Sequence, residues 1–337
     1  MLKLDEKKIR KGKPIGLPYQ GSKKKISKKI IEIIKQNFGT DRPIYDIFGG
    51  GGAITAECIL NGLEVHYNDL DKDITNAFER VVSQDREWIK TLIISREEFF
   101  EIKDKENKTT DDFLKLLVNS FGNKKINYLY SKEISDLKYN LAKEIIEKHD
   151  VFNGYKQTET YKKVTSGLDW NWFNEKQEKH KILQQLQQLE QLERLQRLQQ
   201  LERLGQLEQL QQLQQLERLQ RLEQLERLEQ LERLERLNEV KATNKSYHTF
   251  SEVSGAILYL DPPYEGSHQK GYINQFDSQE FYDWAFEIAK NNIVIISSYS
   301  ISDERFEAVY SFDKAHSTLQ SGTRNDKCEK LFMVKNS

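Results

Sequence analysis

Cysteine, histidine and long apolar runs are scarce in this chain of 337 residues. Its two cysteines, Cys58 and Cys328, are far apart, which excludes a disulfide framework and a cysteine-rich zinc site. The six histidines have no metal-ligand spacing, so no metal is expected. There is no run of about 18 apolar residues, and the first residues lack the apolar core of a secretory signal. These absences predict a cytoplasmic protein without a membrane span.

Proline is also rare, yet two of the five prolines, Pro262 and Pro263, are adjacent. They follow residues 256–260, whose sequence Ala-Ile-Leu-Tyr-Leu is typical of a strand buried on both faces. Proline cannot continue a β-ladder, so the strand must end there and the chain must turn outward. A rigid loop is therefore expected at the carboxyl end of a strand, where open α/β sheets bind their ligands.

The loop of residues 261–264 combines a carboxylate, a backbone carbonyl and an aromatic ring. This combination suits methylation of an exocyclic amino group. The Asp261 carboxylate and the Pro262 carbonyl would accept hydrogen bonds from the two N–H groups of the amine. The nitrogen lone pair would then point at a methyl donor, while Tyr264 would stack on the base. An ordinary turn after a strand explains these four residues equally well.

A run of four glycines, Gly49 to Gly52, lies between a short apolar strand and a helix-like stretch at residues 53–60. Such glycines let a ligand approach the backbone at the start of a helix. The next expected strand, residues 64–68, ends at Asp69, which is placed to accept hydrogen bonds from ribose hydroxyls. This arrangement fits S-adenosylmethionine and NAD equally, and the Asp-Pro-Pro-Tyr loop favours the methyl donor.

A third element, residues 18–23, precedes a helical run that starts near Ile26, and by itself it indicates only a turn and a helix cap. In combination, however, the motifs resemble the Dam-like family of DNA adenine-N6 methyltransferases. The resemblance covers residues 15–180 and 240–337. It rests on six stretches in the family's order, which are Pro18-Tyr19-Gln20-Gly21-Ser22-Lys23, Asp46-Ile47-Phe48-Gly49-Gly50-Gly51-Gly52, Asn68-Asp69, Asp261-Pro262-Pro263-Tyr264, residues 291–298, and residues 322–324 with 329–332.

The resemblance implies an α/β fold, namely the Rossmann-like sheet of S-adenosylmethionine-dependent methyltransferases with an inserted, mainly helical target-recognition lobe. It implies S-adenosylmethionine as cofactor and double-stranded DNA as partner, with adenine flipped out of a specific short sequence and methylated directly on N6. The expected divisions are a basic segment with a cofactor motif at 1–35, a catalytic domain at 36–105 and 245–337, a target-recognition region at 106–182, and a leucine repeat at 183–237.

The resemblance also implies roles for single residues. Tyr19 and Lys23 would contact the methionine end of the cofactor, and Asp69 would bind its ribose. Tyr19 stands where the best-known relatives have tryptophan, and residues 119–123 match the family's middle motif only loosely. The implied catalytic set is Asp261, Pro262, Pro263 and Tyr264. The implied cofactor-binding set is Tyr19, Gly21, Lys23, Asp46, Phe48, Gly50, Gly52, Asp69 and Asp261.

Positive charge is concentrated in two regions, although the whole chain carries a net charge of −1. Residues 1–35 hold twelve Lys or Arg against three acidic residues, and residues 111–175 mix lysines with aromatic residues and asparagines. Such stretches could contact phosphates and base edges, or could simply be solvated surface. The candidate DNA-binding residues are Lys24, Lys25, Lys124, Lys125, Asn153, Lys162 and Arg324.

Residues 183–237 contain leucine at every third position, nineteen in all, separated by Gln, Glu or Arg except at Gly205. This leucine array is rich in helix formers. Three residues advance an α-helix by only about 300°, so the leucine line circles the helix and gives no fixed apolar face, whereas a 3₁₀-helix would align it. A helix, α or 3₁₀, is expected. The array could be a tolerated insertion, a self-association or partner-docking arm, or part of DNA recognition.

Several alternatives stay open at this point. A similar loop could methylate adenine in RNA or a protein glutamine, although glutamine enzymes more often begin the loop with Asn. Alternatively, the leucine array could make this an interaction protein with a vestigial enzyme fold. The repeat also suggests a phage or prophage enzyme in a bacterial cell, with a link to restriction-modification.

Overall fold

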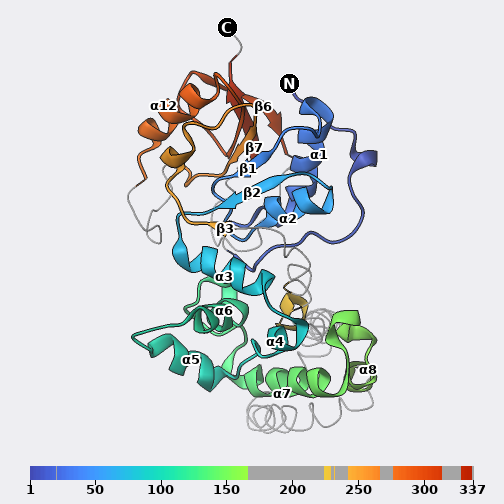
Figure 1. Cartoon of the computed structure of the whole chain (residues 1–337). Helices are drawn as coiled ribbons and strands as arrows, with labels where there is room; N and C mark the ends of the chain where they lie inside the picture. The colour runs from blue at the N-terminus through green and yellow to red at the C-terminus, as the bar shows by residue number, and fades with distance from the viewer. Residues whose placement is uncertain are drawn as a thin grey trace, which may run out of the picture.

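The computed structural model describes residues 1–19, 21–165, 224–228, 231, 242–265, 276–312 and 328–335. Two parts are visible in Figure 1, a sheet flanked by helices and, below it, a lobe made of helices. Among the described residues, no helix has the length and apolarity that crossing a membrane requires.

One sheet with the order β3-β2-β1-β4-β5-β7-β6 is formed within the described residues. The first five strands in this order run parallel, whereas β7 is antiparallel to both β5 and β6. This is an α/β sheet of the Rossmann-like kind with an antiparallel hairpin at one edge. The strands are β1 Ile44–Asp46, β2 Val65–Asn68, β3 Ala242–Thr243, β4 Ile257–Leu260, β5 Ile293–Ser298, β6 Phe306–Ser311 and β7 Lys330–Val334.

Helices cover both faces of the sheet, which explains the unbroken apolar run before the prolines. Ile257 and Tyr259 of β4 pack in one cluster with α1 and α2, and Leu258 and Leu260 pack in another with α12. All four residues of the strand are buried. The covering helices are α1 Ser27–Phe38, α2 Ala53–Leu60 and α12 Ser278–Ile288. Cys58, on α2, belongs to this core as a free thiol.

The helical lobe is inserted between β2 and β3. Its helices are α4 Arg86–Lys90, α5 Arg96–Asp104, α6 Thr110–Val118, α7 Lys132–Lys148 and α8 Glu159–Thr165, and α3 Lys72–Val82 lies at the junction with the sheet (Figure 1). Helix α5 was expected in the catalytic domain, but Phe99 and Ile102 on it pack against Leu116 of α6 and Tyr128. The lobe therefore begins before residue 106, and the sheet resumes at Ala242 rather than at 245.

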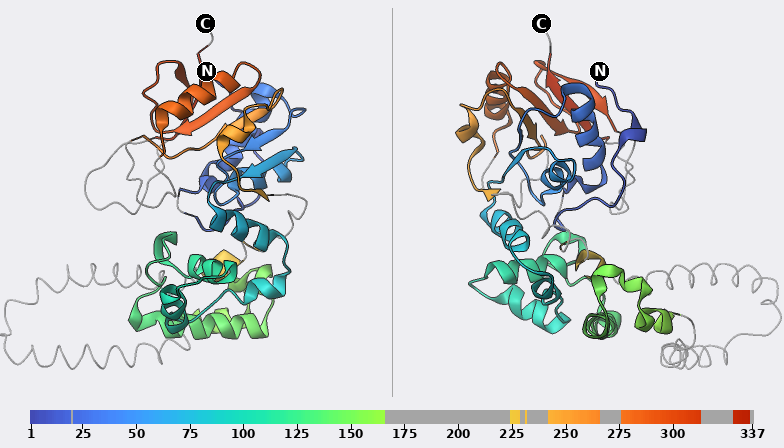
Figure 2. Two further views of the ribbon diagram at one scale, coloured as in Figure 1. Left: turned by 60° about the vertical axis from the view of Figure 1, so that its left-hand side comes forward. Right: turned by 45° about the vertical axis from the view of Figure 1, so that its right-hand side comes forward.

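A short piece of the leucine array lies in the lobe. Residues 224–228 and 231 are α-helical, and Figure 2 places this segment among the lobe helices in both views. Leu225, Leu228 and Leu231 are fully buried in the same core cluster as Leu117 and Ile145. The other residues of the array lie outside the described ranges.

Candidate functional site

The loop after β4 lies at the carboxyl edge of the parallel strands, next to the loops after β1 and β2. Parallel strands end at the same edge, so Asp261, the glycine run and Asp69 converge there although they are far apart in sequence. Strand β4 ends at Leu260, directly before this loop, as the two prolines predicted. Within the loop, Pro262 is buried.

Lys23 joins the loop from the opposite end of the chain. Its Nζ donates hydrogen bonds to the two carboxylate oxygens of Asp261, at 2.7 and 2.6 Å, and to the hydroxyl of Tyr264, at 2.6 Å. Ser22 caps the short 3₁₀-helix that carries Lys23 by accepting a hydrogen bond from the backbone of Lys24. The motif at residues 18–23 thus brings a cation directly to the Asp-Pro-Pro-Tyr loop.

Glu329, which immediately precedes β7, completes this cluster. Its Oε1 accepts hydrogen bonds from the hydroxyls of Tyr264, at 2.7 Å, and Ser297, at 2.6 Å, and lies 3.7 Å from Lys23 Nζ. The sequence motif contained Glu329 but gave it no role. The only signal was a carboxylate placed directly before an apolar strand.

The aromatic ring of Tyr264 is held from two sides. Its hydroxyl lies between Lys23 and Glu329, and its ring packs edge-on against the ring of Tyr299, with the centroids 4.7 Å apart. Tyr299 is partly exposed and was missed from the sequence, because a lone tyrosine after a strand carries no pattern.

The glycine run forms a tight loop over the end of β2. The Gly50 N–H donates to Asp69 Oδ2 at 2.7 Å, and the Tyr67 hydroxyl donates to the Gly50 carbonyl at 2.8 Å. Gly52 has φ +70°, and a Cβ there would lie 2.2 Å from Phe78. The Tyr19 ring covers the loop so closely that a Cβ on Gly50 would lie 3.0 Å from it. Only glycine fits this close approach.

Asp46 and Phe48, both expected to bind the cofactor, differ in their surroundings. Asp46 is fully buried, and its Oδ2 accepts hydrogen bonds from the backbone and the hydroxyl of Thr55, at 3.1 and 2.6 Å. It therefore fixes the start of α2 below the glycine loop. Phe48 is half-buried and packs against the rings of Tyr247 and Phe281.

The site has more acidic than basic side chains, and they are buried or partly buried. Burial raises the pKa of Asp46 to about 7 and those of Asp69 and Asp261 to about 6. Burial alone would lower the pKa of Lys23, but Asp261 and then Glu329 raise it above its ordinary value. The ammonium in turn opposes the rise at Asp261. Such a group of carboxylates favours a ligand that brings positive charge.

Comparison with protein families identifies the family of the chain that carries this site. A family model described as D12 class N6 adenine-specific DNA methyltransferase matches residues 19–319. The chain belongs to this family. A search of curated proteins found no match. This methyltransferase transfers a methyl group from S-adenosylmethionine to the N6 amino group of adenine in DNA, as the family does.

The carboxyl edge suits the cofactor in shape and in charge. The glycine loop leaves no room for Cβ atoms at Gly50 and Gly52, and the carboxylates around it are hard to ionise without a cation. S-adenosylmethionine carries positive charge on its sulfonium and its ammonium, which these carboxylates would stabilise.

We expect the affinity of the methyltransferase for S-adenosylmethionine to rise by about tenfold or more between pH 5.5 and 7.5. A cationic ligand favours the ionised carboxylates, so at low pH binding must first release protons whose pKa values burial has raised to about 6 and 7. Above those values the affinity should level off. Calorimetry in buffers of different ionisation enthalpy measures both the affinity and the released protons.

Asp69→Asn should remove the part of this pH dependence that titrates near 6 and leave the part near 7, which belongs to Asp46. Asp73→Asn is its control, because Asp73 lies on the surface of the first turn of α3. An affinity that does not change over this pH range would show that the carboxylates stay in one charge state when the cofactor binds.

The six candidate DNA-binding residues that the structure describes come from different parts of the molecule. Lys24 is turned inward, with its Nζ 3.4 Å from the Gly16 carbonyl. Burial, and then the neighbouring Arg227, lowers the pKa of Lys24 to about 8. Lys25 is exposed beside it. Lys124 and Lys125 follow α6, with Lys125 Nζ 3.8 Å from the centroid of the Phe113 ring.

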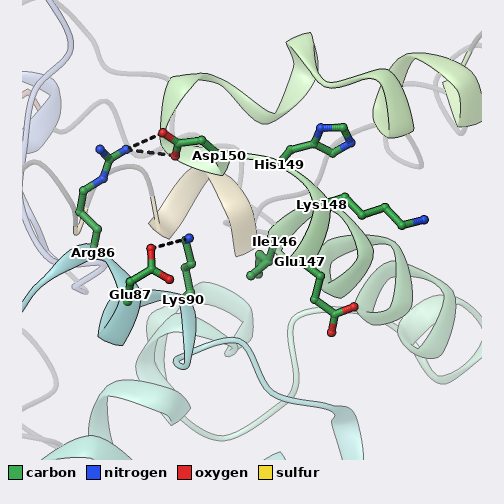
Figure 3. Close-up of a pocket in the computed structure, with 8 residues that line it drawn as sticks. All are labelled: Arg86, Glu87, Lys90, Ile146, Glu147, Lys148, His149 and Asp150. Carbon is green, nitrogen blue, oxygen red and sulfur yellow. Dashed lines mark hydrogen bonds and ion pairs between the residues drawn. The ribbon is translucent and has the colours of Figure 1, made fainter.

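Two further candidates lie at the far end of the lobe. Lys162 is exposed on α8, and Asn153 donates to Asp150 at 2.9 Å. Arg324 lies outside the described residues. Figure 3 shows a cavity between α4 and the end of α7, lined by none of the expected site residues. Ion pairs join Arg86 to Asp150 and Lys90 to Glu87 there, and no residue of the loop 261–264 lines the cavity.

Proposed function

We propose that Asp261 and Pro262 bind the amino group of an adenine that has been flipped out of duplex DNA. The observation that carries this proposal is the partly buried cluster of Lys23, Asp261 and Tyr264 beside the glycine loop. The amino group is a weak nucleophile because its lone pair is delocalised into the base. Two acceptors, the Asp261 carboxylate and the Pro262 carbonyl, draw on its N–H bonds and turn the lone pair outward.

The direct transfer forms a bond from N6 to the methyl carbon and breaks the bond from that carbon to the sulfonium sulfur. S-adenosylmethionine, when bound, supplies the methyl group. In this proposal the Asp261 carboxylate receives the proton that the amino nitrogen then loses. Lys23 supports this role because its charge favours the ionised form of Asp261 in spite of burial.

Tyr264 and Pro263 complete the proposed catalytic loop. The Tyr264 ring stacks on the flipped base, and its hydroxyl is anchored by Lys23 and Glu329. Pro263 stiffens the backbone between the two acceptors and the ring. An orientation fixed before the base arrives lowers the entropy cost of binding it.

The cofactor is held in this proposal by the loops around Tyr19, Gly21, Lys23, Phe48, Gly50, Gly52 and Asp69. Asp69 accepts hydrogen bonds from the ribose hydroxyls. Its two carboxylate oxygens also accept hydrogen bonds from the backbone N–H groups of Gly50 and Asp71. Asp46 contributes indirectly. It is buried and accepts hydrogen bonds from Thr55, and so it holds the start of α2, which follows the glycine loop.

We also propose that the duplex contacts the face of the lobe that carries Lys124 and Lys125, with Lys24 and Lys25 beside it. Lys24 and Arg227 repel each other, and a phosphate near them would relieve that repulsion. Contacts of DNA with Asn153, Lys162 and Arg324 stay predictions from the sequence. The same is true of self-association or partner docking through residues 183–237, of a cytoplasmic location, and of a phage origin or a link to restriction-modification.

Transfer of label from S-adenosylmethionine to unmethylated duplex DNA tests the proposal, followed by digestion to nucleosides and sequencing that reports modified adenines. We expect N6-methyladenine confined to one short sequence. A duplex in which those adenines already carry the methyl group is the control and should accept no label. Label on RNA of the same sequence, or on a protein glutamine, with none on DNA would overturn the proposed substrate.

A further inference from the structure

A short stretch of the leucine array, residues 224–228 and 231, has a fixed apolar face although the leucine spacing gives none over the whole array. Each triplet turns an α-helix by about 300°, so three successive leucines stay within an arc of about 120°. Leu225, Leu228 and Leu231 lie within this arc, and all three are fully buried in the lobe core. Gln224 falls within the same arc and is also fully buried.

Gln224 contacts both sides of a hairpin that follows α6. We call residues 119–129 the lobe hairpin. Ser120 and Tyr128 pair in antiparallel fashion, the Phe121 N–H donates to the Asn127 carbonyl, and the Leu129 N–H donates to the Asn119 carbonyl. The side-chain amide of Gln224 donates to Asn119 Oδ1 on one side and to the Tyr128 hydroxyl, at 3.0 Å, on the other.

Arg227 binds the start of the same hairpin. Its Nη1 donates to the backbone carbonyls of Leu117, Val118 and Ser120. The carbonyls of Leu117 and Val118 are at the end of α6, where the backbone carries partial negative charge and lacks partners within the helix, and that of Ser120 follows in the hairpin. A cation from the array thus fixes the point at which the chain leaves α6 for the lobe hairpin.

The tip of the lobe hairpin is exposed and chemically mixed. Phe121 and Ile126 are 52 % and 53 % exposed, and Lys124 is exposed between them. Asn123 and Lys125 both have φ +59°, a left-handed conformation that directs the turn outward. Large apolar side chains beside lysines suit bases and phosphates at close range.

We propose that Gln224 and Arg227 of the leucine array are positioning residues that hold the lobe hairpin for DNA recognition. This proposal rests on the proposed contact between the lobe and duplex DNA. It assigns a role to two side chains of the repeat, of which Gln224 contacts both sides of the hairpin base and Arg227 contacts its start.

The test compares Gln224→Leu with Gln209→Leu, because residues 208–210 repeat the triplet Glu-Gln-Leu found at 223–225. Leucine at 224 removes both donated hydrogen bonds and also removes Gln224 Oε1, a buried acceptor without a partner in the described part of the chain. The melting temperature should therefore change little. We expect the KM for DNA to rise about fivefold or more in Gln224→Leu, with kcat and cofactor affinity unchanged.

Hydrogen exchange of the full-length enzyme reports the hairpin directly. The Phe121 and Leu129 amides should exchange faster in Gln224→Leu and at the original rate in Gln209→Leu. Unchanged exchange in Gln224→Leu would overturn the proposal, as would equal effects of the two variants.

The double variant Phe121→Ala, Lys124→Ala separates this proposal from the proposed DNA contact. If the tip meets DNA, that variant raises the KM for DNA without changing exchange at Leu129. If its KM is unchanged while Gln224→Leu still speeds exchange, the DNA contact fails, and Gln224 then holds the hairpin without serving recognition, which overturns the inference.

Discussion

Asp261→Ala is expected to lower kcat by about 10³-fold or more, because it removes the only charged acceptor proposed for the amino group. The fold should survive the change. Lys23 keeps Glu329 as an anionic neighbour, 3.7 Å away, and Tyr264 keeps its hydrogen bond to the same carboxylate. Affinity for S-adenosylmethionine should fall without being lost, since one carboxylate leaves the site. Single-turnover methylation of duplex DNA and calorimetry of cofactor binding measure the two effects separately.

Asp277→Ala is the matched control for this prediction. Asp277 caps α12 by accepting hydrogen bonds from the backbones of Gln279 and Glu280, and it lies outside the catalytic loop. Its loss should cost about 1 kcal/mol of stability and leave kcat unchanged. Equal product formation by Asp261→Ala and the unaltered enzyme would remove Asp261 from the chemistry.

Gly52→Ala is expected to lower the free energy of unfolding by about 2–5 kcal/mol and to weaken cofactor binding. The left-handed φ of +70° costs an alanine about 1–2 kcal/mol. The new Cβ would also lie 2.2 Å from Phe78, and overpacking adds about 1–3 kcal/mol. Phe78 cannot move alone, because its ring stacks on Tyr67, whose hydroxyl holds the Gly50 carbonyl.

Gly62→Ala isolates the backbone part of this effect. Gly62 has nearly the same φ, +69°, but nothing lies within 4 Å of the position of a Cβ. Chemical denaturation of the two variants should show a larger loss for Gly52→Ala. If the losses are equal, Phe78 yields to the new methyl group and the tight packing below the loop has no energetic consequence.

Local pattern was sufficient for much of the sheet. The apolar run at 256–260 and the two prolines predicted a buried strand and its end, and β4 Ile257–Leu260 confirms both. The stretch at 53–60, after the glycines, is α2 Ala53–Leu60. These predictions succeeded because strand burial, proline geometry and glycine loops depend on neighbouring residues.

Local sequence pattern could not predict which side chains contact one another within the site. Lys23 and Asp261 are 238 positions apart, and no local pattern predicted the ion pair between them. Glu329 and Tyr299 had no assigned role at all. Their contacts arise because β5 and β7 pair beside β4, and strand order is a property of the whole chain.

The leucine array shows most clearly which features depend on local sequence and which depend on the tertiary structure. The sequence by itself determined helix-forming composition and a leucine at every third position, which gives no fixed face over nineteen triplets. It could not determine which triplets are buried, because neighbouring triplets are nearly identical. Only the tertiary structure decided that Leu225, Leu228 and Leu231 enter the lobe core. The physical reason is that an apolar face exists only over a few successive triplets, and packing against Leu117, Ile145 and the other core residues of the lobe selects which triplets provide it.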